Sequence, residues 1–442
     1  MDIKFKKYIL KSGIKVIIIP SKSNLTFISA NFLLGHNFEN KSNTQITHYY
    51  EHLMSELTSE KYKDRLKIID ELSHRGASRN AFVGRNQMSF YIKGLYDDFE
   101  YFIDLISNTL YKFHIDKKIA IKEKKAAIQE YNNYLSKFTY NFNFKIFKYL
   151  YPKYKFVSDR KYHIKNIKKF TVKDIKKFIK NKICAKNTVI LAVCPKNKVK
   201  NTTNIINKYF NKIKIKKNCN NDYNILQHNN KQFKIIYINN NFNNNILLKF
   251  IVCKNIKYLS KEHIILDLLD DILFKFDYGI FYKKLRIELG LIYNISFNID
   301  IDIVSSKATY EINTSCTEKK LPIIINEIIK ILDTYKITKS DYKDSKIRLK
   351  ISKENYKFTN LTSYNHYKRH LLYNMPFFSN KEVNKLYDSI TYKDVVEYFE
   401  IFKKEILNKG IVFYYAKKNL NNDIDKQLKK SVIQNKYKML YI

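Results

Sequence analysis

Residues 25–57 read LTFISANFLLGHNFENKSNTQITHYYEHLMSEL, and the fold prediction starts from this stretch. Its first eleven residues are mostly apolar and predict a buried strand. A polar loop follows, after which Thr47 is placed to cap a helix that begins at His48. A buried strand that leads through a loop into an amphipathic helix indicates a domain of mixed α and β structure.

The same order of elements recurs further along the chain. Residues 246–253, ILLKFIVC, resemble the first strand, and residues 262–276 resemble the helix that follows it. The chain between these repeats is rich in Asn, which is typical of a linker. We therefore predict two similar α+β domains, 1–220 and 221–442, each a mostly antiparallel sheet with helices packed on one face.

Two further helices have clear sequence signals. Residues 61–76 place Leu66, Ile69 and Leu72 at helical spacing, which predicts that these three side chains form the buried stripe. Residues 171–183 follow Thr171, a good helix cap. At the N-terminus, two short strands are predicted around a Ser12-Gly13 turn, so we expect little room for a removable targeting segment.

Length and composition exclude several classes of protein. The chain has 442 residues with 45% hydrophobic residues, which is enough for two cores and too apolar for a disordered chain. Its formal net charge is +41, but only eight of the 82 basic residues are Arg. Heavy use of Lys, Asn, Ile and Tyr is typical of A+T-rich coding. We therefore interpret the charge mainly as coding bias and do not expect nucleic acid to be the specific partner.

The cysteines and the hydropathy pattern bear on the compartment. Five cysteines are present, none paired as C-x-x-C, so a disulfide framework and a cysteine zinc site are not predicted, and a reducing compartment is favoured. No run of 18 apolar residues occurs, so no transmembrane segment is expected.

The sequence His48-Tyr49-Tyr50-Glu51-His52 has the spacing H-x-x-E-H on a predicted helix. Residues i and i+4 share a helical face, so His48 and His52 can present ring nitrogens to one metal ion. Two imidazoles and a carboxylate suit zinc with a position open for water, and Glu51 would then be the general base. The alternative is a helix whose histidines are merely packed or solvated.

A third protein ligand is needed, and the helix predicted over residues 116–136 offers Glu123 and Glu130. These lie seven residues apart, close to two helical turns, so both side chains face the same way. A helix packed against the first could direct one of them at the metal and hold the other just outside the metal ligands. The alternative is that both are solvated partners of the many nearby lysines.

Four motifs in the same order resemble the pitrilysin/insulinase family of zinc metallopeptidases, the inverzincins, which includes the mitochondrial processing peptidases. They are H-x-x-E-H at 48–52; Glu130, 78 residues after His52, with Glu123 seven residues earlier; Gly76 leading to Asn80-Ala81-Phe82; and Arg286-Ile287-Glu288-Leu289-Gly290-Leu291-Ile292-Tyr293. The likeness spans both halves, although the second half has no H-x-x-E-H. At this length the chain is similar to the half-length, two-domain members.

The resemblance implies a zinc endopeptidase that hydrolyses peptides or unstructured polypeptide segments. His48, His52 and Glu130 would bind one Zn²⁺ per chain, Glu51 would activate the zinc-bound water, and Glu123 would orient the zinc-binding helix or its neighbours. Asn80 and Ala81 would pair with an extended substrate. Arg286 and Tyr293 would polarise the scissile carbonyl. Without the resemblance, Arg286 reads as a surface ion pair with Glu288 or another acid, and Tyr293 as a packed core residue.

Partners and source are also implied. Half-length members act as homodimers or beside a partner subunit, so we expect one of these assemblies. The chain is similar to zinc proteases of giant or large DNA viruses, which implies a cytoplasmic location, in a host cell if viral, or the virion. Two alternatives stay open: a catalytically silent family member that acts as a binding or assembly subunit, and a basic polyanion-binding protein.

Overall fold

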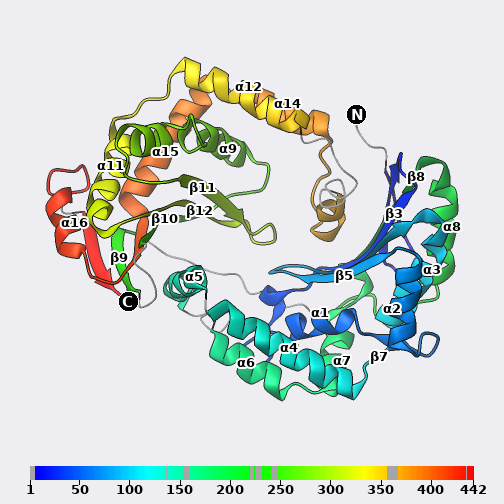
Figure 1. Cartoon of the computed structure of the whole chain (residues 1–442). Helices are drawn as coiled ribbons and strands as arrows, with labels where there is room; N and C mark the ends of the chain where they lie inside the picture. The colour runs from blue at the N-terminus through cyan, green and yellow to red at the C-terminus, as the bar shows by residue number, and fades with distance from the viewer. Residues whose placement is uncertain are drawn as a thin grey trace. The chain divides into compact units, whose positions relative to one another are not determined.

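The computed structural model describes residues 5–135, 137–152, 159–219, 223, 231–240, 246–355, 367–434 and 436–442. The chain forms two compact units (Figure 1). Unit 1 comprises Met1–Ser136, Tyr154–Ile225 and Phe358–Ser379, and unit 2 comprises Lys137–Lys153, Leu226–Lys357 and Asn380–Ile442. No helix in the described ranges is long and apolar enough to cross a bilayer.

Unit 1 is built on a sheet whose six described strands lie in the order β1-β2-β8-β3-β6-β5. Neighbours are antiparallel except β2 and β8, which are parallel. Of the described strands only β6 pairs with β5, so the far side of β5 is an open edge. The strands are β1 Lys6–Ile9, β2 Lys15–Ser21, β3 Leu25–Phe32, β5 Ser78–Val83, β6 Met88–Leu95 and β8 Thr188–Pro195.

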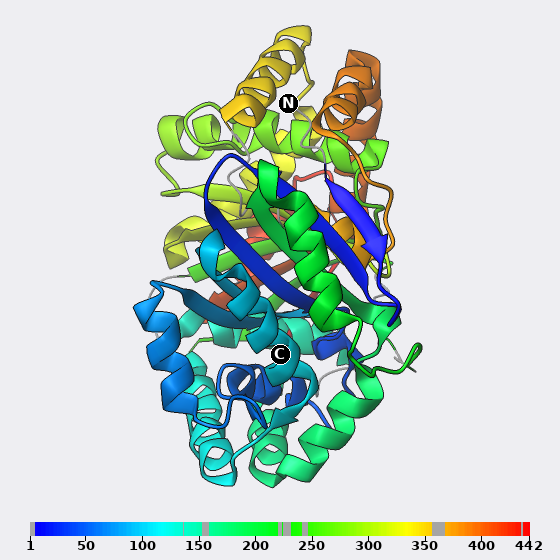
Figure 2. The ribbon, with the colours of Figure 1, turned by 90° about the vertical axis from the view of Figure 1, so that its right-hand side faces the viewer.

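Helices cover one face of this sheet. Alternate residues of the strands, such as Val16, Ile28 and Phe90, point into a core shared with α1 and α3. Figure 2 looks onto this layer, with α8 lying across the strands in green. The helices are α1 Ile46–Met54, α2 Arg65–His74, α3 Phe99–Tyr111, α4 Lys117–Leu135, α6 Arg160–Lys169, α7 Val172–Lys182 and α8 Val199–Phe210, with a two-stranded sheet of β4 Thr58–Ser59 and β7 Phe113–His114.

Unit 2 has a sheet of the same design, with described strands in the order β11-β12-β10-β13-β9-β14. Its strands are β9 Phe233–Asn239, β10 Ile246–Asn255, β11 Ile295–Ile301, β12 Lys307–Cys316, β13 Ile411–Ala416 and β14 Tyr437–Tyr441. Its helices are α5 Phe138–Leu150, α9 Lys261–Leu273, α10 Ile280–Tyr282, a π-helix Lys283–Glu288, α11 Leu321–Thr334, α12 Lys339–Asn355, α14 Asn380–Ser389, α15 Tyr392–Lys409 and α16 Asn421–Leu428.

The two sheets have matching topologies. From the open edge inward, β5-β6-β3-β8-β2 corresponds to β11-β12-β10-β13-β9, with three antiparallel pairings followed by one parallel pairing in both. Only the outermost pairing differs, because β1 is antiparallel to β2 whereas β14 is parallel to β9. The predicted α+β class with mostly antiparallel sheets is confirmed.

The opposite face of each sheet is also partly covered, by a segment from the other half of the sequence. In unit 1, Tyr367, Leu371 and Phe377 pack on sheet residues such as Ile17 and Leu191. In unit 2, α5 packs on the sheet through Phe142, Ile146 and Leu150. These segments bury alternate strand residues that helices on one face alone would leave in water.

Two local predictions are wrong. Thr47 does not cap α1, because the helix begins at Ile46 and Gln45 occupies the cap position with φ of 74°. In α2, Leu66 is 61% exposed, and the buried residues are Ile68 and Leu72, which lie one turn apart on the face that packs on the core. The predicted Thr171 cap of α7 is confirmed, and Asp174 completes its capping box.

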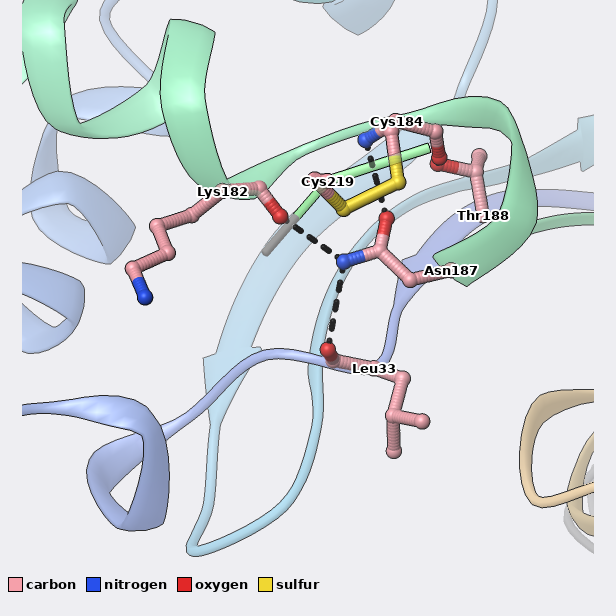
Figure 3. Close-up of a disulfide and its surroundings, with 6 residues drawn as sticks. All are labelled: Leu33, Lys182, Cys184, Asn187, Thr188 and Cys219. Carbon is pink, nitrogen blue, oxygen red and sulfur yellow. Dashed lines mark hydrogen bonds between the residues drawn. A yellow bond between two sulfur atoms is a disulfide. The ribbon is translucent and has the colours of Figure 1, made fainter. Parts of the chain in front are cut away.

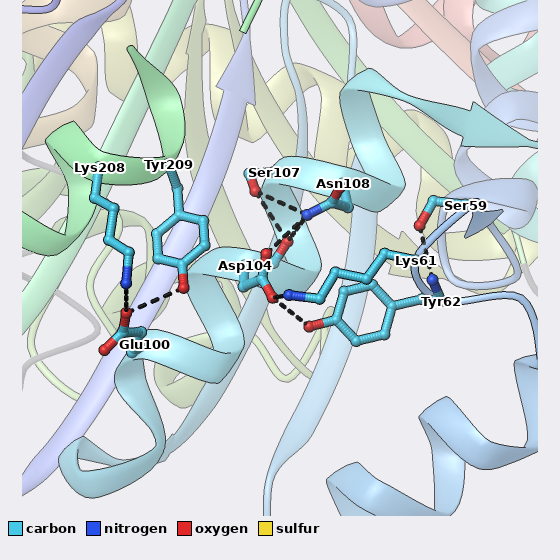
Figure 4. A network of polar contacts seen from close by, with 9 residues as sticks. All are labelled: Ser59, Lys61, Tyr62, Glu100, Asp104, Ser107, Asn108, Lys208 and Tyr209. Carbon is cyan, nitrogen blue, oxygen red and sulfur yellow. Dashed lines mark hydrogen bonds and ion pairs between the residues drawn. The ribbon is translucent and has the colours of Figure 1, made fainter. Parts of the chain in front are cut away.

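Two acidic side chains of α3 tie neighbouring segments to that helix (Figure 4). Asp104 accepts hydrogen bonds from Lys61, from the Tyr62 hydroxyl at 2.7 Å and from Asn108 at 2.8 Å. Glu100 accepts from Lys208 of α8 at 2.7 Å. The chain that leaves α1 through β4 is thereby fixed against α3, which limits where the C-terminal end of α1 can lie.

A disulfide joins Cys184 to Cys219, which corrects the prediction that no disulfide forms (Figure 3). The pair is separated by 35 residues, so no short spacing marks it in the sequence. The chain returns after α8 and lies beside residues 184–186, where Ala185 N donates to Lys216 O at 2.8 Å. Asn187 Oδ1 accepts from Cys184 N at 2.9 Å. With this disulfide present, the cysteines no longer favour a reducing compartment.

We predict that Cys184→Ser lowers the free energy of unfolding by about 4 kcal/mol, because the disulfide closes a loop of 35 residues in the unfolded chain. Chemical denaturation with and without a reductant measures this. Reductant should destabilise the wild-type protein to the level of the variant and leave the variant unchanged. Titration of the denatured, unreduced wild type should find three free thiols, and five would contradict the disulfide.

Candidate metal centre and substrate groove

A pocket of about 430 Å³ lies in unit 1 where α1, α4 and the open edge of β5 meet. Its wall is rich in carboxylates and imidazoles, in contrast to the basic chain as a whole. The lining residues are His48, Glu51, His52, Ser55, Glu56, Asn80, Ala81, Phe82, Val83, Glu123 and Glu130. Seven of the nine site residues predicted from the sequence line this pocket, and α1, α4 and β5 supply them. The other two, Arg286 and Tyr293, belong to unit 2.

Three polar atoms converge inside this pocket. His48 Nε2 and His52 Nε2 each lie 3.2 Å from Glu130 Oε2, and they lie 3.3 Å from each other. In the described part of the chain, this is the one group of His, Cys, Asp and Glu side chains close enough to share a metal ion. The predicted convergence of the two histidines with Glu130 is thus present in the geometry.

Helical periodicity explains how these residues meet. His48 and His52 are one turn apart on α1, and Glu123 and Glu130 are two turns apart on α4, so each pair shares a helical face. The two helices pack against each other with these faces opposed. Tyr49, one of the residues between the histidines, is buried and donates its hydroxyl hydrogen to Ala120 O at 2.6 Å, which holds α4 against α1.

His52 is oriented by a carboxylate. Its Nδ1 lies 3.5 Å from Glu123 Oε2, and only 14% of the Glu123 side chain is exposed. A proton on Nδ1 would be shared with Glu123, which leaves the lone pair of Nε2 free to face His48 and Glu130. The alternative that Glu123 and Glu130 are solvated partners of lysine is therefore wrong for both side chains.

The carboxylates of the pocket differ in electrostatic environment. Hydrogen bonding to His48, helped by the Tyr134 hydroxyl at 3.1 Å, lowers the pKa of Glu130 to about 2. Burial raises the pKa of Glu51 against the opposing effect of the two histidines. Glu130 is thus held as an anion, whereas Glu51 is the more basic carboxylate and the better proton acceptor.

The donor set fits a divalent cation. Two neutral imidazole nitrogens and a carboxylate oxygen all carry lone pairs, and such atoms repel one another at 3.2–3.3 Å unless a proton or a cation lies among them. The His52–Glu123 contact fixes the tautomer that metal binding requires. His48, His52 and Glu130 are therefore the residues that could hold zinc.

The strand β5 forms one wall of the pocket with its open edge. Asn80, Ala81 and Phe82 line the pocket, and Ala81 is paired with Phe90 of β6 on the inner side. Asn80 Oδ1 accepts from Ala81 N at 2.9 Å. An unpaired strand edge beside the converging ligands can accept an extended peptide through main-chain hydrogen bonds.

Arg286 and Tyr293 lie in unit 2, where the π-helix leads towards β11. The Arg286 guanidinium lies 5.2 Å from the centre of the Tyr293 ring and donates to Ile292 O at 3.3 Å. Glu288 instead pairs with Lys284 at 2.6 Å, and Tyr293 is 75% exposed. The readings of Arg286 as a partner of Glu288 and of Tyr293 as a core residue are therefore wrong.

Unit 2 has an ion pair where its helices repeat the α1–α4 packing. Asp271 of α9 is buried and contacts Arg348 of α12, with 2.7 Å from Asp271 Oδ2 to the guanidinium. Tyr278 donates its hydroxyl hydrogen to the same Asp271 at 3.0 Å. A guanidinium thus neutralises the buried acid of α9, and the described residues form no cluster of metal ligands there.

Several residues of the site had no signal in the sequence. Ser55, Glu56 and Val83 line the pocket because of how α1 and β5 end. Tyr134 could have been found, since it lies one helical turn after Glu130. The buried Glu39 beneath α1, described below, comes from a polar loop and could be found only from the structure.

Comparison with known proteins identifies the domains. Residues 26–145 match the family model described as Insulinase (Peptidase family M16), and residues 169–349 match the model described as Peptidase M16 inactive domain. The first range contains α1, β5 and α4, and hence the whole set of converging ligands.

Curated relatives and solved structures agree with this. The chain is 28% identical over 115 residues to the mitochondrial-processing peptidase subunit beta of Saccharomyces cerevisiae, and 24% identical over 126 residues to that of Dictyostelium discoideum. These matches cover 25% and 28% of the chain, and the chain spans about a quarter of the length of these relatives (24% and 26%).

Among solved structures, a protease from Helicobacter pylori is similar with a TM-score of 0.72 over 93% of this chain and 99% of its own, at 14% identity. A peptidase M16 inactive domain from Pseudomonas fluorescens has a TM-score of 0.78 over 94% and 98%, also at 14% identity. These structures share the fold, and the family models add the assignment. The chain is built from domains of the peptidase M16, or insulinase, family.

Proposed function

We propose that this protein is a zinc-dependent endopeptidase that hydrolyses peptides or unstructured polypeptide segments. The observation that carries the proposal is the meeting of His48, His52 and Glu130 within 3.3 Å in a pocket whose wall is an open strand edge. Membership of peptidase-family domains supports the same reaction class.

His48, His52 and Glu130 hold the metal in this proposal, and bound zinc supplies Lewis acidity towards water and the scissile carbonyl. Glu51 lines the same pocket and takes the proton of the attacking water. Its raised pKa favours that role, because a more basic carboxylate accepts a proton more readily. Glu123 holds the His52 ring so that Nε2 faces the metal.

The substrate backbone pairs with the edge of β5 beside Asn80 and Ala81. Main-chain pairing needs an extended segment and tolerates many side chains, so folded proteins are poor substrates. Arg286 and Tyr293 keep the role implied by the family resemblance, which is to contact the scissile region of the substrate. Their exposure and mutual contact support a role in binding rather than in packing.

Assembly and location stay predictions. The relatives in yeast and Dictyostelium are named as subunits, which favours a homodimer or a partner chain for this protein as well. The cytoplasmic location and the likeness to viral zinc proteases rest on the sequence alone. A catalytically silent subunit would bind stoichiometric zinc and cleave no peptide. Cleavage of a peptide by the purified protein would therefore exclude that alternative.

The purified protein should contain one zinc ion per chain. His48→Ala and His52→Ala should each abolish stoichiometric binding, because each variant keeps only two of the three protein ligands that a catalytic zinc site uses. Elemental analysis after gel filtration measures the metal content. His74→Ala, on the exposed face of α2, is the control and should keep its zinc. Equal zinc content in all four proteins would contradict the assigned ligands.

Glu51→Gln should lower kcat for an unstructured fluorogenic peptide by about 100- to 10,000-fold, because the amide cannot accept the proton. Zinc content should stay at one per chain, since Glu51 is not a ligand. Glu60→Gln, the same chemical change at an exposed position outside the pocket, should leave kcat unchanged. Full activity of Glu51→Gln would refute the assigned mechanism.

Glu123→Gln should weaken zinc binding by about 10- to 100-fold without abolishing it, because the His52 ring loses the carboxylate behind it. Competition with a chelator of known affinity measures the dissociation constant. An affinity equal to that of Glu60→Gln would show that the 3.5 Å contact has no part in metal binding.

A further inference from the structure

A buried carboxylate lies beneath the start of the helix that carries both histidines. Glu39 follows the short 3-10 helix η1, His36–Phe38, and is 2% exposed. Its Oε2 accepts from Gln45 N at 2.7 Å, and its Oε1 accepts from Thr47 N at 2.9 Å and from the Thr47 hydroxyl at 2.5 Å. Glu39 thus binds the first turn of α1 through three hydrogen bonds.

These bonds replace an ordinary helix cap. Gln45 occupies the cap position in a left-handed conformation, and its side chain makes no capping hydrogen bond. The first N–H groups of a helix have no partner within the helix, and an anion there also interacts favourably with the helix dipole. Glu39 supplies that anion, and it lies six residues before Gln45 and eight residues before Thr47 in the chain.

The charge of Glu39 is maintained despite its burial. Burial alone would raise its pKa, but the nearby His36 and hydrogen bonds from Thr47 and the Gln45 N–H together lower the pKa below the ordinary value of a glutamate. His36 Nδ1 lies 3.8 Å from Glu39 Oε2. A buried anion that accepts several N–H and O–H groups fixes their positions more firmly than a neutral acceptor would.

The two histidines of α1 are supported in different ways. His52 has Glu123 behind its Nδ1, whereas His48 Nδ1 is buried and has no hydrogen-bond partner among the described residues. The direction of the His48 ring therefore depends on its backbone and on packing. Its backbone follows Thr47 directly, and its ring meets the edge of the Tyr131 ring at 5.3 Å and 89°.

The same turn is linked to α4. Tyr131 donates its hydroxyl hydrogen to Gln45 Oε1, and Tyr131 is the neighbour of Glu130 in the chain. Gln45 is also one of the residues that Glu39 binds through the backbone. One network therefore runs from Glu39 through the first turn of α1 to the helix that supplies the third converging ligand.

We infer that Glu39 is a positioning residue of the metal centre, which sets the place of His48 by anchoring the first turn of α1. This inference rests on the proposed function. Glu39 itself contacts neither metal nor substrate in this role. Glu123 positions His52 by contacting its imidazole ring, whereas Glu39 positions His48 by binding the backbone N–H of the preceding residue, Thr47.

The test is Glu39→Gln, which keeps the size of the side chain but turns an NH₂ group towards hydrogen-bond donors. Cobalt(II) is the probe, since its visible absorption reports ligand geometry and its affinity can be measured by chelator competition. We expect cobalt affinity to fall about 10- to 100-fold and the absorption bands to shift, because His48 moves relative to His52 and Glu130. In peptide cleavage by the zinc form, kcat should fall while KM stays unchanged, because β5 is untouched.

The matched control is Asp64→Asn. Asp64 caps α2 in the same unit by accepting from Leu66 N at 2.9 Å and Lys67 N at 3.3 Å, and it does not line the pocket. Loss of this cap should lower thermal stability and leave the cobalt spectrum and affinity unchanged. A merely structural role for Glu39 predicts the same behaviour for Glu39→Gln.

Thr47 provides a milder pair of variants in case Glu39→Gln does not fold. Thr47→Val removes one hydrogen bond to Glu39 and should weaken cobalt binding, whereas Thr47→Ser keeps the hydroxyl and should restore it. Cobalt affinities of Glu39→Gln and Thr47→Val equal to that of Asp64→Asn would overturn the inference while leaving the proposed function standing. A wild-type protein that binds no cobalt or zinc would overturn both.

Discussion

Three lone-pair atoms held within 3.3 Å of one another are the constraint on which the rest of unit 1 depends. Without a proton or a cation among them, His48 Nε2, His52 Nε2 and Glu130 Oε2 repel, so the surrounding fold must hold them together. The packing of α1 against α4, the Tyr49–Ala120 hydrogen bond and the fixing of β4 against α3 all oppose that repulsion. The fold therefore holds together three atoms that repel one another until a proton or a cation lies among them.

In unit 2, a buried carboxylate at the corresponding helix packing is balanced by an arginine side chain. Its α9 presents the buried Asp271 to α12, and the Arg348 guanidinium supplies the positive charge. An internal cation satisfies the carboxylate permanently, so no ligand atom is left available. The sheets of the two units match in order and direction from the open edge inward, and this matched scaffold carries a group of side chains that could hold a metal ion in one unit and an ion pair in the other.

Charge is distributed unevenly between the chain and its pocket. The formal net charge is +41, yet the pocket is lined by Glu51, Glu56, Glu123 and Glu130 and contains no lysine or arginine among its lining residues. A polyanion would be repelled at this wall, whereas pairing of a neutral peptide backbone with the edge of β5 would have no charge requirement. The composition of the chain is therefore a poor guide to what the pocket binds.

The periodic features of the fold and the site are predictable from the pattern of residues. Turns of 3.6 residues place His48 with His52 and Glu123 with Glu130, and alternation along the strands gives the α+β class, because both follow from local backbone geometry. Tertiary structure alone decided the rest: the pairing of Cys184 with Cys219, the open edge of β5 beside α1, the buried stripe of α2 and the anchoring of α1 by Glu39 in place of Thr47. Each of these features depends on which distant segments of the chain meet in the folded protein, and a local pattern of residues carries no information about that.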